Sequence, residues 1–286
     1  MRTQLPELPS KEVLGDLAKE AAGEERVPPE LIEKDFYLTR LLWALGQELE
    51  ENVLLKGGTL LSKVDLQFLR MSQDIDLVLP GMASKFRAGN VRRMRGVGSV
   101  LSRTATMVGV SLNQPAGSIR ESGRYSLWNL TYESVFPTPS IAVEVNIRPV
   151  LAPTRRVLLR QLLVDPRAGD YREASCHALA ADEARAEKVR AAFTRKEIRD
   201  FYDLERLLDA KADFTSASFV ALVDQKLSET NAPPLNRQPR SFGLDAAGMR
   251  RLRQAIETDL NAVLRTDAPA FDLGRMLGRF DLLWAK

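Results

Sequence analysis

Apolar and polar positions change their spacing several times along the chain, and these changes predict which segments are helices and which are strands. Ser10 precedes a short amphipathic segment over 10–22, and Pro28-Pro29 opens a longer one over 30–49, where apolar residues recur every three to four positions. Shorter runs come next that are apolar throughout or alternate with polar residues. We expect strands at 52–56, 74–79, 125–133, 141–148 and 157–164, and helices at 59–64 and 83–108.

From residue 181 onward the pattern is helical. Amphipathic segments are expected at 182–195, 199–211, 216–229, 246–265 and 272–284, and a proline-rich loop over 231–243 interrupts them. The chain is therefore expected to be an α+β protein with two lobes. A lobe with a mixed sheet and flanking helices would occupy residues 1–165, and an all-helical lobe would occupy residues 166–286.

The composition is that of a soluble globular protein, and it excludes several kinds of chemistry. The 286 residues include one cysteine, Cys176, and one histidine, His177, so we expect no disulfide framework, cysteine-rich metal site or His-dependent triad. Neighbours on a strand face opposite sides, so these two are interpreted as ordinary residues. No apolar run reaches the about 18–20 residues of a membrane span, and the first residues lack a signal peptide's apolar stretch. We expect a soluble protein of a reducing compartment, the cytoplasm.

A glycine pair at the end of the first expected strand indicates phosphate binding. Lys56 ends that strand, Gly57-Gly58 comes next, and a short helix is expected from Thr59. Glycine lets main-chain amides approach a ligand closely, and a helix N-terminus favours anions. Lys56 and Lys63 could add positive charge. An isolated pair of glycines is more often an ordinary turn, so the interpretation depends on the residues of the next strand.

Two carboxylates, Asp74 and Asp76, lie on that next expected strand. The strand period of two puts both on one face, while Ile75 and Leu77 point into the core. Neighbouring carboxylates repel one another unless a cation lies between them, and Mg²⁺ prefers hard oxygen ligands together with substrate phosphates. A pair of such ions can activate a hydroxyl and stabilise a leaving pyrophosphate. Solvated acids at a strand end are the simpler alternative for an isolated Asp-x-Asp.

The order of these motifs resembles that of nucleotidyltransferases of the polymerase-β superfamily, and more closely that of the AbiEii/AbiGii toxin family. The resemblance rests on KGGTLLSK at 56–63 and on RMSQDIDL at 70–77. Two further stretches are similar to the same family, IEKDFYLTRLL at 32–42 and the pair EKVRAAFTR and RDFYDL within 187–204. The last part of the chain, 212–286, contributes nothing to the resemblance.

The resemblance implies a fold, an activity and partners. The fold would be a polymerase-β-type nucleotidyltransferase lobe and then a helical lobe. The enzyme would use Mg²⁺ or Mn²⁺ and an NTP co-substrate, and it would transfer the nucleotidyl group to an RNA acceptor, with the 3′ end of tRNA expected, so that translation stops. Such toxins are usually paired with a separately encoded antitoxin. A protein or small-molecule acceptor is the alternative, and a non-catalytic binding protein is a third, which the intact aspartate pair disfavours.

Carried over residue by residue, the resemblance assigns roles in the first lobe. The residues that would bind the triphosphate are Gly57, Gly58, Thr59 and Ser72. Asp74 and Asp76 would hold the metal, and Lys56 would bind phosphate or position the acceptor. Ser72 could instead be only a turn residue, and Lys56 a solvated strand end. Glu144 is the expected third metal ligand on strand 141–148, although any half-exposed strand shows the same alternation.

In the second lobe the resemblance singles out Lys188, which would meet the nucleotide phosphates as part of the catalytic set. Arg195 lies seven positions later and therefore shares its helix face. Asp203 would orient Lys188, act as a base near the acceptor hydroxyl, or only pair with an arginine. Asp200 could be no more than a charge at a helix start. Tyr202 is interpreted as a core aromatic rather than as a base-stacking residue.

The distribution of charge adds one further signal. The net charge is only +3, from 41 Lys and Arg against 38 Asp and Glu, yet no acidic residue occurs between Asp76 and Glu121. The residues in that interval proposed to bind nucleic acid are Lys85, Arg87, Arg92, Arg93 and Arg95. Such a patch suits a phosphate backbone, with a solvated helix face as the simpler alternative. We expect a positive groove near the metal site, and a second basic group at Arg155, Arg156 and Arg160.

Overall fold

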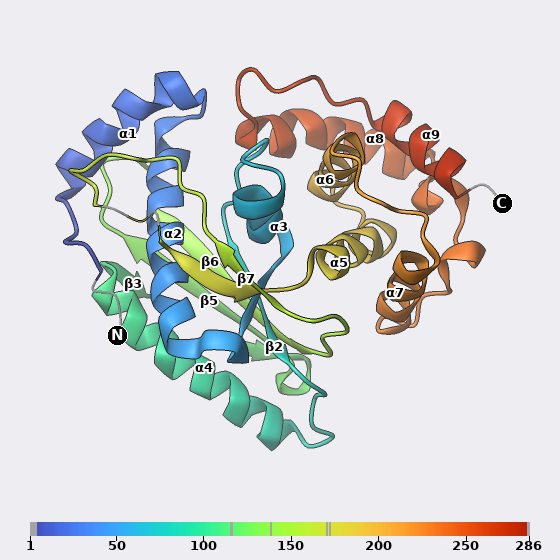
Figure 1. Ribbon diagram of the computed structural model, residues 1–286, viewed down its shortest axis with the longest axis horizontal. Helices are drawn as coiled ribbons and strands as arrows, with labels where there is room; N and C mark the ends of the chain where they lie inside the picture. The colour runs from blue at the N-terminus through green and yellow to red at the C-terminus, as the bar shows by residue number, and fades with distance from the viewer. Residues whose placement is uncertain (1–4, 115–116, 138, 170, 172, 285–286) are drawn as a thin grey trace. The chain divides into compact units, whose positions relative to one another are not determined.

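Over the residues that the structure describes, a mixed sheet of eight strands forms the centre of the N-terminal part of the chain in the computed structural model (Figure 1). The chain divides into two units, residues 1–179 and 180–286. The structure describes residues 5–114, 117–137, 139–169, 171 and 173–284. The first unit holds the sheet and the helices that flank it, and the second unit is helical.

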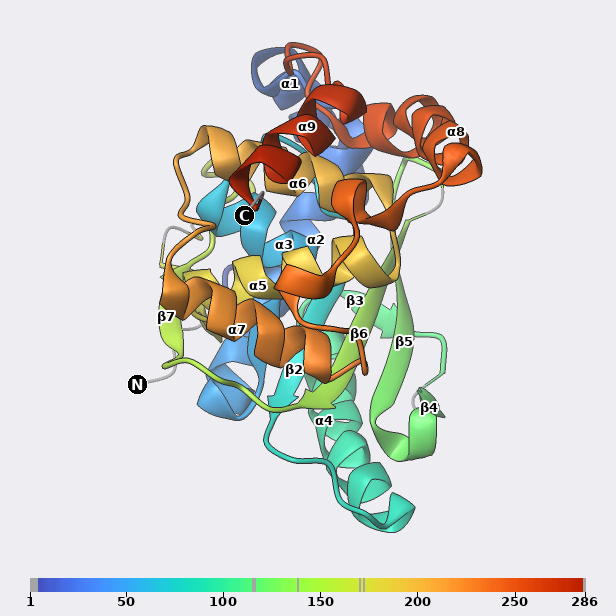
Figure 2. The ribbon, with the colours of Figure 1, turned by 90° about the vertical axis from the view of Figure 1, so that its right-hand side faces the viewer.

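The sheet mixes parallel and antiparallel pairs. Its strands are β1 (Leu54–Lys56), β2 (Ile75–Pro80), β3 (Val110–Leu112), β4 (Ser118–Arg120), β5 (Tyr125–Tyr132), β6 (Ser140–Arg148), β7 (Arg155–Leu158) and β8 (Ser175–Ala178). Their order is β3-β5-β6-β2-β1-β8-β7, and β4 also pairs with β5. β2 is parallel to β6 and β1 is parallel to β8, whereas the other pairs are antiparallel. Figure 2 shows β2, β6 and β5 side by side.

The helices of the first unit match the predicted segments, although the last of them begins at Arg87 rather than at residue 83. They are α1 (Lys11–Glu25), α2 (Pro29–Leu49), α3 (Gly57–Leu60), which continues into a π-helical turn over Leu61–Asp65, and α4 (Arg87–Met107). Ser10 caps α1, because its Oγ accepts a hydrogen bond from the main-chain N–H of Val13 (3.3 Å). α2 begins at Pro29, whose fixed φ suits a first helical turn.

The two faces of the sheet differ in polarity. Ile75 of β2, Val143 of β6 and Trp128 of β5 are in register and almost completely buried, so they lie on the same face. Helix α4 covers this apolar face, because its Gly98 lies directly against the indole ring of Trp128. α2 packs against α4. The opposite face carries polar side chains, among them Lys56, Asp76 and Glu144, beside the buried apolar pair of Leu54 and Val78.

The second unit is built from helices around an aromatic core. They are α5 (Ala181–Thr194), α6 (Ile198–Asp209), α7 (Ala217–Ser228), α8 (Ala246–Ala255) and α9 (Leu273–Leu283). Phe280 of α9 lies with its ring centroid 5.1 Å from that of Phe214 and 5.0 Å from that of Trp284. The stretch 212–286 therefore supplies part of this core. None of the described helices in either unit is long and apolar enough to cross a membrane.

Most predicted elements are confirmed, and the errors concern short strands. The helix expected at 83–108 is present as α4 despite its glycines, but the strand expected at 157–164 is wrong in extent, because β7 ends at Leu158. β3, β4 and β8 were not predicted. Each has only three or four residues, too few for periodicity to reveal. β3 and β8 pair with strands distant in sequence, whereas β4 forms a short hairpin with β5. The boundary between the units also differs from the prediction. The first unit ends at Leu179 and includes β8, whereas the sequence predicts that the helical lobe begins at residue 166.

Gly46 tests how closely α2 approaches β8. A Cβ at Gly46 would lie 2.7 Å from the carbonyl oxygen of Ser175, so Gly46→Ala should lower the free energy of unfolding by about 1–3 kcal/mol. Gly96→Ala, in α4, should instead raise the free energy of unfolding by about 0.5–1 kcal/mol, because glycine inside a helix is less favourable than alanine. The added Cβ would meet no atom of a neighbouring segment within 4 Å. Chemical denaturation measures both values. A stabilising effect of Gly46→Ala would contradict the close packing of α2 on β8.

Candidate active site

Polar residues from three strands form a row across the sheet. In the register of β1, β2 and β6, Lys56 is opposite Asp76, and Asp76 is opposite Glu144. Residues in register point to the same side, so this row lies on the face away from α4. Lys56 Nζ is 3.9 Å from Asp76 Oδ1, and the two side chains are 16% and 27% exposed. Folding therefore brings one cation and two carboxylates together from strands that are separate in sequence.

The glycine turn is in direct contact with this row. Gly57 has a φ of +68°, a conformation that residues with a side chain rarely adopt. A Cβ at this position would lie 2.1 Å from Oδ2 of Asp76 and 2.7 Å from its Cγ. Both the backbone angle and the available space require glycine. The main chain of the predicted phosphate-binding turn therefore lies directly against the carboxylate of Asp76.

A buried arginine lies behind the second glycine. A Cβ at Gly58 would be 2.8 Å from Nη2 of Arg70 and 3.3 Å from Oγ of Ser72. Arg70 is 4% exposed, and its Nη1 donates to the carbonyl oxygen of Met71 (3.0 Å). Its fixed charge makes the glycine turn more favourable for an anion. Arg70 is part of the motif at 70–77, but the resemblance assigns it no role.

The side chains of Thr59 and Ser72 connect the turn to the segment before β2. The Thr59 hydroxyl donates to the main-chain carbonyl of Asp74 and is hydrogen-bonded with Oγ of Ser72 (2.8 Å). Thr59 is fully buried. Its side chain therefore serves the fold, and the main-chain N–H is the group of Thr59 that is suited to a phosphate.

Asp74 lies immediately before β2. Its Oδ1 accepts a long hydrogen bond from the main-chain N–H of Ala142 (3.4 Å). Lys34 of α2 interacts electrostatically with this carboxylate: burial lowers the pKa of Lys34, and the charge of Asp74 opposes that shift. A half-buried cation from α2 therefore accompanies the first of the two predicted metal ligands.

Tyr125 of β5 extends the polar row beyond Glu144. It is in register with Asn146, two residues along β6 from Glu144, and therefore faces the same side. Burial raises the pKa of Tyr125 to about 12, and the negative charge of Glu144, a hydrogen bond with Glu144 and the charge of Asp76 add to the shift. The phenol stays protonated and donates to the Glu144 carboxylate. Sequence reasoning missed Tyr125, which only the strand register reveals.

A buried ion pair anchors the π-helical turn after the glycines. Lys63 Nζ donates to Oδ1 of Asp35 (2.5 Å), to Oγ1 of Thr39 (2.8 Å) and to the carbonyl oxygen of Arg160 (3.0 Å), so all three donors are used. The Lys63 and Asp35 side chains are 1% and 2% exposed. Burial raises the pKa of Asp35 and lowers that of Lys63, while each charge opposes the shift of the other. The idea that Lys63 adds charge to a phosphate site is wrong, because its ammonium is buried in the core.

The carboxylates fit a hard divalent cation that also binds a phosphorylated substrate. Mg²⁺ in proteins usually takes one or two carboxylates and completes its shell with water and substrate phosphates. Among the described residues, no group of three or more His, Cys, Asp and Glu side chains is arranged to hold a metal by itself. Metal binding by Asp74 and Asp76 together with a triphosphate, and the role of Glu144 as a third ligand, stay predictions.

The basic helix lies on the other side of the sheet from this polar row. Its exposed cationic side chains, with one from the preceding loop, are Lys85, Arg87, Arg92, Arg95 and Arg103. α4 covers the apolar face, whereas Asp76 and Glu144 are in the row on the opposite face. The expectation of a basic groove near the acidic residues is therefore wrong, since the sheet separates them.

Other basic residues of the first unit are used within the fold. Arg93, one of the predicted nucleic-acid contacts, donates to the carbonyl oxygens of Pro80 (2.6 Å) and Met82 (3.2 Å). In the second basic group, Nη2 of Arg155 donates to both carboxylate oxygens of Asp65 (2.8 and 2.9 Å). These contacts hold loops onto the sheet, so neither arginine is a simple surface charge.

In the second unit, Lys188 of α5 lies in a buried cluster with two aspartates of α6. Its Nζ is 2.8 Å from Oδ1 of Asp200 and 2.8 Å from Oδ2 of Asp203, and Lys188 is 4% exposed. Arg195 also donates to Asp200 (2.7 Å). Burial alone would raise the pKa of Asp200, but Lys188 and Arg195 outweigh it and hold that pKa well below its usual range. The structure thus brings together the residues that the sequence singled out in this lobe.

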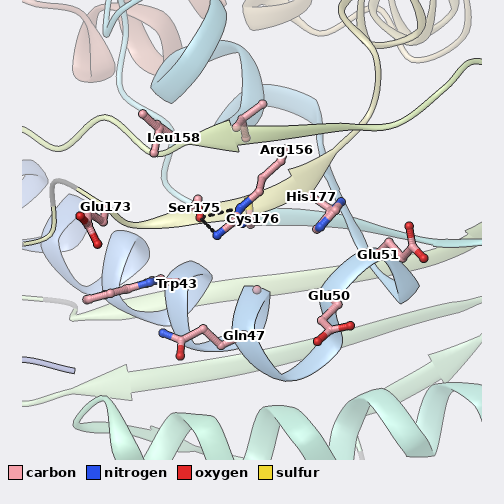
Figure 3. Close-up of a pocket in the computed structure, with 12 residues that line it drawn as sticks. Trp43, Gln47, Glu50, Glu51, Arg156, Leu158, Glu173, Ser175, Cys176 and His177 are labelled. Atoms are coloured by element: carbon pink, nitrogen blue, oxygen red, sulfur yellow. Dashed lines mark hydrogen bonds between the residues drawn. The ribbon is translucent and has the colours of Figure 1, made fainter. Parts of the chain in front are cut away.

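The cysteine and the histidine line a different cavity of the first unit. Figure 3 shows this space of about 830 Å³ between the C-terminal part of α2 and strands β7 and β8. Arg156 donates to Oγ of Ser175 there (2.9 and 3.1 Å). Burial raises the pKa of Cys176 to about 12, so the thiol stays protonated and is not a nucleophile. This agrees with the interpretation of Cys176 and His177 as ordinary residues.

Comparison with known proteins identifies the family. Residues 40–276 match the family described as nucleotidyl transferase AbiEii toxin, type IV toxin–antitoxin system. No curated protein matches the chain. The matched range includes the glycine turn, the aspartate pair, Glu144 and the Lys188 cluster.

Solved structures show the same fold. MenT4, a nucleotidyltransferase toxin of Mycobacterium tuberculosis H37Rv, is similar over 95% of this chain and 98% of its own, with 21% identity and a TM-score of 0.55. JHP933 of Helicobacter pylori is similar over 91% of this chain and 92% of its own, with 13% identity and a TM-score of 0.50. The predicted α+β fold, a mixed sheet and then a helical region, is confirmed. The chain belongs to the AbiEii family of nucleotidyltransferase toxins of type IV toxin–antitoxin systems.

Proposed function

We propose that this nucleotidyltransferase transfers the nucleotidyl group of an NTP to an RNA acceptor, with the 3′ end of tRNA as the expected site, and thereby stops translation. The observation that carries the proposal is the contact between Gly57 and Asp76. The main chain that would hold a triphosphate lies against the carboxylate that would act at its α-phosphate. An acceptor hydroxyl attacks that phosphorus, and pyrophosphate leaves.

The residues around the glycine turn would bind and orient the triphosphate. Gly57 and Gly58 offer main-chain N–H groups, and the buried charge of Arg70 lies behind them. Lys56, beside Asp76, would neutralise charge that develops on the phosphate in the transition state. Such fixed positioning is the main contribution that a protein makes to phosphoryl and nucleotidyl transfer.

Asp74 and Asp76 would hold Mg²⁺ or Mn²⁺, and Glu144, held by Tyr125, would be a third ligand. When bound, such an ion neutralises phosphate charge and makes a hydroxyl a better nucleophile. Lys34 would balance the charge of Asp74.

In the helical unit, Lys188 would contact a nucleotide phosphate. Its ammonium has three donors, and Asp200 and Asp203 account for two of them. The two aspartates would therefore orient the remaining N–H. Asp203 is a positioning residue in this scheme, because it acts through Lys188.

The exposed arginines of α4 would contact the acceptor away from the reacting hydroxyl. They lie on the face of the sheet opposite Asp76, so only an extended acceptor can contact both sides of the lobe. This arrangement supports a macromolecule such as RNA over a small molecule. A separately encoded antitoxin is the expected partner, and the cytoplasm, where tRNA and NTPs occur, is the expected location.

Transfer of labelled nucleotide tests the acceptor. The protein, incubated with each labelled NTP, Mg²⁺ and total tRNA, should label tRNA and should leave a protein extract unlabelled. Asp76→Asn should reduce labelling by about 100-fold or more, whereas Asp16→Asn, on the exposed side of α1, should not change it. Label on the protein extract alone would contradict the RNA acceptor, and the absence of label from every acceptor would contradict transfer itself.

Gly57→Ala tests the contact between the turn and Asp76. The new Cβ must displace the Asp76 carboxylate, so we expect kcat/KM to fall by about 100-fold. Gly81→Ala is a matched control: Gly81 also has a positive φ, +109°, but it is exposed, and its added Cβ would make only an ordinary contact, 3.7 Å from Nη2 of Arg93. Both variants incur backbone strain, and only Gly57→Ala should lose activity. Equal kinetics of the two variants would show that the turn does not position Asp76.

Charge removal on α4 tests its contact with RNA. Replacing Arg92 and Arg95 together by Gln should weaken tRNA binding, most at low salt, and should lower the slope of log affinity against log salt by up to about two. NTP affinity should not change. The control is Lys11→Gln with Lys19→Gln on α1, which removes the same charge. An equal loss of NTP affinity in the α4 variant would contradict an acceptor surface on α4.

A further inference from the structure

Helices α6 and α9 hold a cluster of three arginines and two carboxylates that the proposed reaction does not use. Glu205 of α6 is fully buried and accepts hydrogen bonds from Arg206 (2.5 Å) and from Arg275 of α9 (3.1 Å). Asp209, one turn after Glu205, pairs with Arg206 (3.2 Å) and with Arg279 of α9 (2.7 Å). The whole cluster lies within the second unit.

The cluster has more hydrogen-bond donors than its own carboxylates can use. Three guanidinium groups carry about fifteen N–H donors, and two carboxylates offer about eight lone pairs. Three positive charges also exceed two negative ones. A ligand that brings several acceptor oxygens and negative charge would use the remaining donors. A phosphate group has these properties, and arginine binds phosphate through paired N–H groups.

Arg206 is the fixed part of the cluster. It is 6% exposed, and its Nε has no hydrogen-bond partner among the described atoms. Its guanidinium lies over the ring of Tyr202 at 5.3 Å from the centroid. Tyr202 is itself fully buried, as expected of a core aromatic, so it holds the guanidinium in place from below.

A cavity opens beside the three arginines. Its volume is about 570 Å³. The residues that line it are Arg206, Asp209, Pro269, Ala270, Arg275 and Arg279. The side chains of Arg275 and Arg279 are 54% and 34% exposed, so a ligand from solvent can reach both.

We propose that this cavity, the α6–α9 arginine pocket, binds a phosphate group. The inference rests on the proposed function, in which the ligand is a backbone phosphate of the RNA acceptor. A free nucleotide would offer the same chemistry. The pocket gives α9 and the loop before it, to which the sequence motifs assign no role, a part in holding the acceptor.

The same ion pairs also join α6 to α9, and that structural role is compatible with the pocket. A clamp between the helices needs one arginine for each carboxylate, and Arg275 and Arg279 already provide it. Arg206 is a third, buried cation that pairs with the same carboxylates, Glu205 and Asp209. The pocket therefore has one positive charge more than the ion pairs between α6 and α9 require.

Binding of labelled tRNA and of ATP by the full chain tests the pocket. The variants are Arg275→Gln and Arg279→Gln, and the matched control is Arg250→Gln, which removes one charge from the exposed surface of α8 in the same unit. We expect each pocket variant to raise the Kd for tRNA by about 3- to 10-fold at low salt and to lower the salt slope by about one. Arg250→Gln should change the Kd by less than about two-fold. Arg275→Lys should bind tRNA more tightly than Arg275→Gln does but less tightly than the wild type. Lysine keeps the positive charge but lacks the paired N–H groups of the guanidinium.

The outcomes distinguish an RNA phosphate from a nucleotide phosphate as the ligand. They also distinguish failure of the pocket from failure of the proposed transfer to RNA. Weaker tRNA binding with unchanged ATP binding supports an RNA phosphate in the pocket. Weaker ATP binding with unchanged tRNA binding supports a phosphate site whose ligand is the nucleotide. Wild-type affinities for both ligands in both pocket variants would overturn the pocket while leaving the proposed transfer intact. Failure of the wild-type protein to bind tRNA would instead contradict the RNA acceptor. Thermal unfolding of each variant shows whether the clamp has been lost.

Discussion

The close approach of Gly57 to Asp76 is the constraint on which the rest of the active site depends. The backbone angle of Gly57 and the 2.1 Å that would separate a Cβ from the carboxylate both exclude any side chain at this position. The contact fixes the glycine turn relative to β2. Arg70 and Ser72 then lie against Gly58, and the hydroxyl of Thr59 connects the turn to the main chain of Asp74. The glycine turn and the segment that carries both aspartates are thereby held together.

The two-sided sheet explains how this group is supported. One face is apolar and is covered by α4, so that strands β2, β5 and β6 are held in a fixed register. The register then brings Lys56, Asp76 and Glu144 into one row on the other face. Lys63 and Asp35 complete the support, because their buried ion pair fixes the turn after the glycines to α2. Lys56 and Asp76 therefore lie in the polar row, whereas Lys63 of the same motif is buried in the core and supports the turn.

The sequence predicts the helices and the family well, because both depend on local patterns. The spacing of apolar residues predicts α2 and α4, and the order of Gly57-Gly58 and Asp74-x-Asp76 predicts the family. Contacts between distant segments cannot be predicted in this way. The hydrogen bond of Tyr125 with Glu144 depends on strand register, and the burial of Lys63 depends on an aspartate far away in the sequence. The position of the basic helix behind the sheet likewise results from packing, since composition cannot show which face α4 covers.

The central claim is that Asp74 and Asp76 bind a metal together with the triphosphate held by the glycine turn. Binding of Mn²⁺ in the presence of an unreactive NTP analogue, measured by electron paramagnetic resonance, tests it most directly. We expect stoichiometric Mn²⁺ binding that depends on the analogue and is lost when both aspartates are replaced by Asn. Wild-type Mn²⁺ affinity in that double variant would contradict the claim.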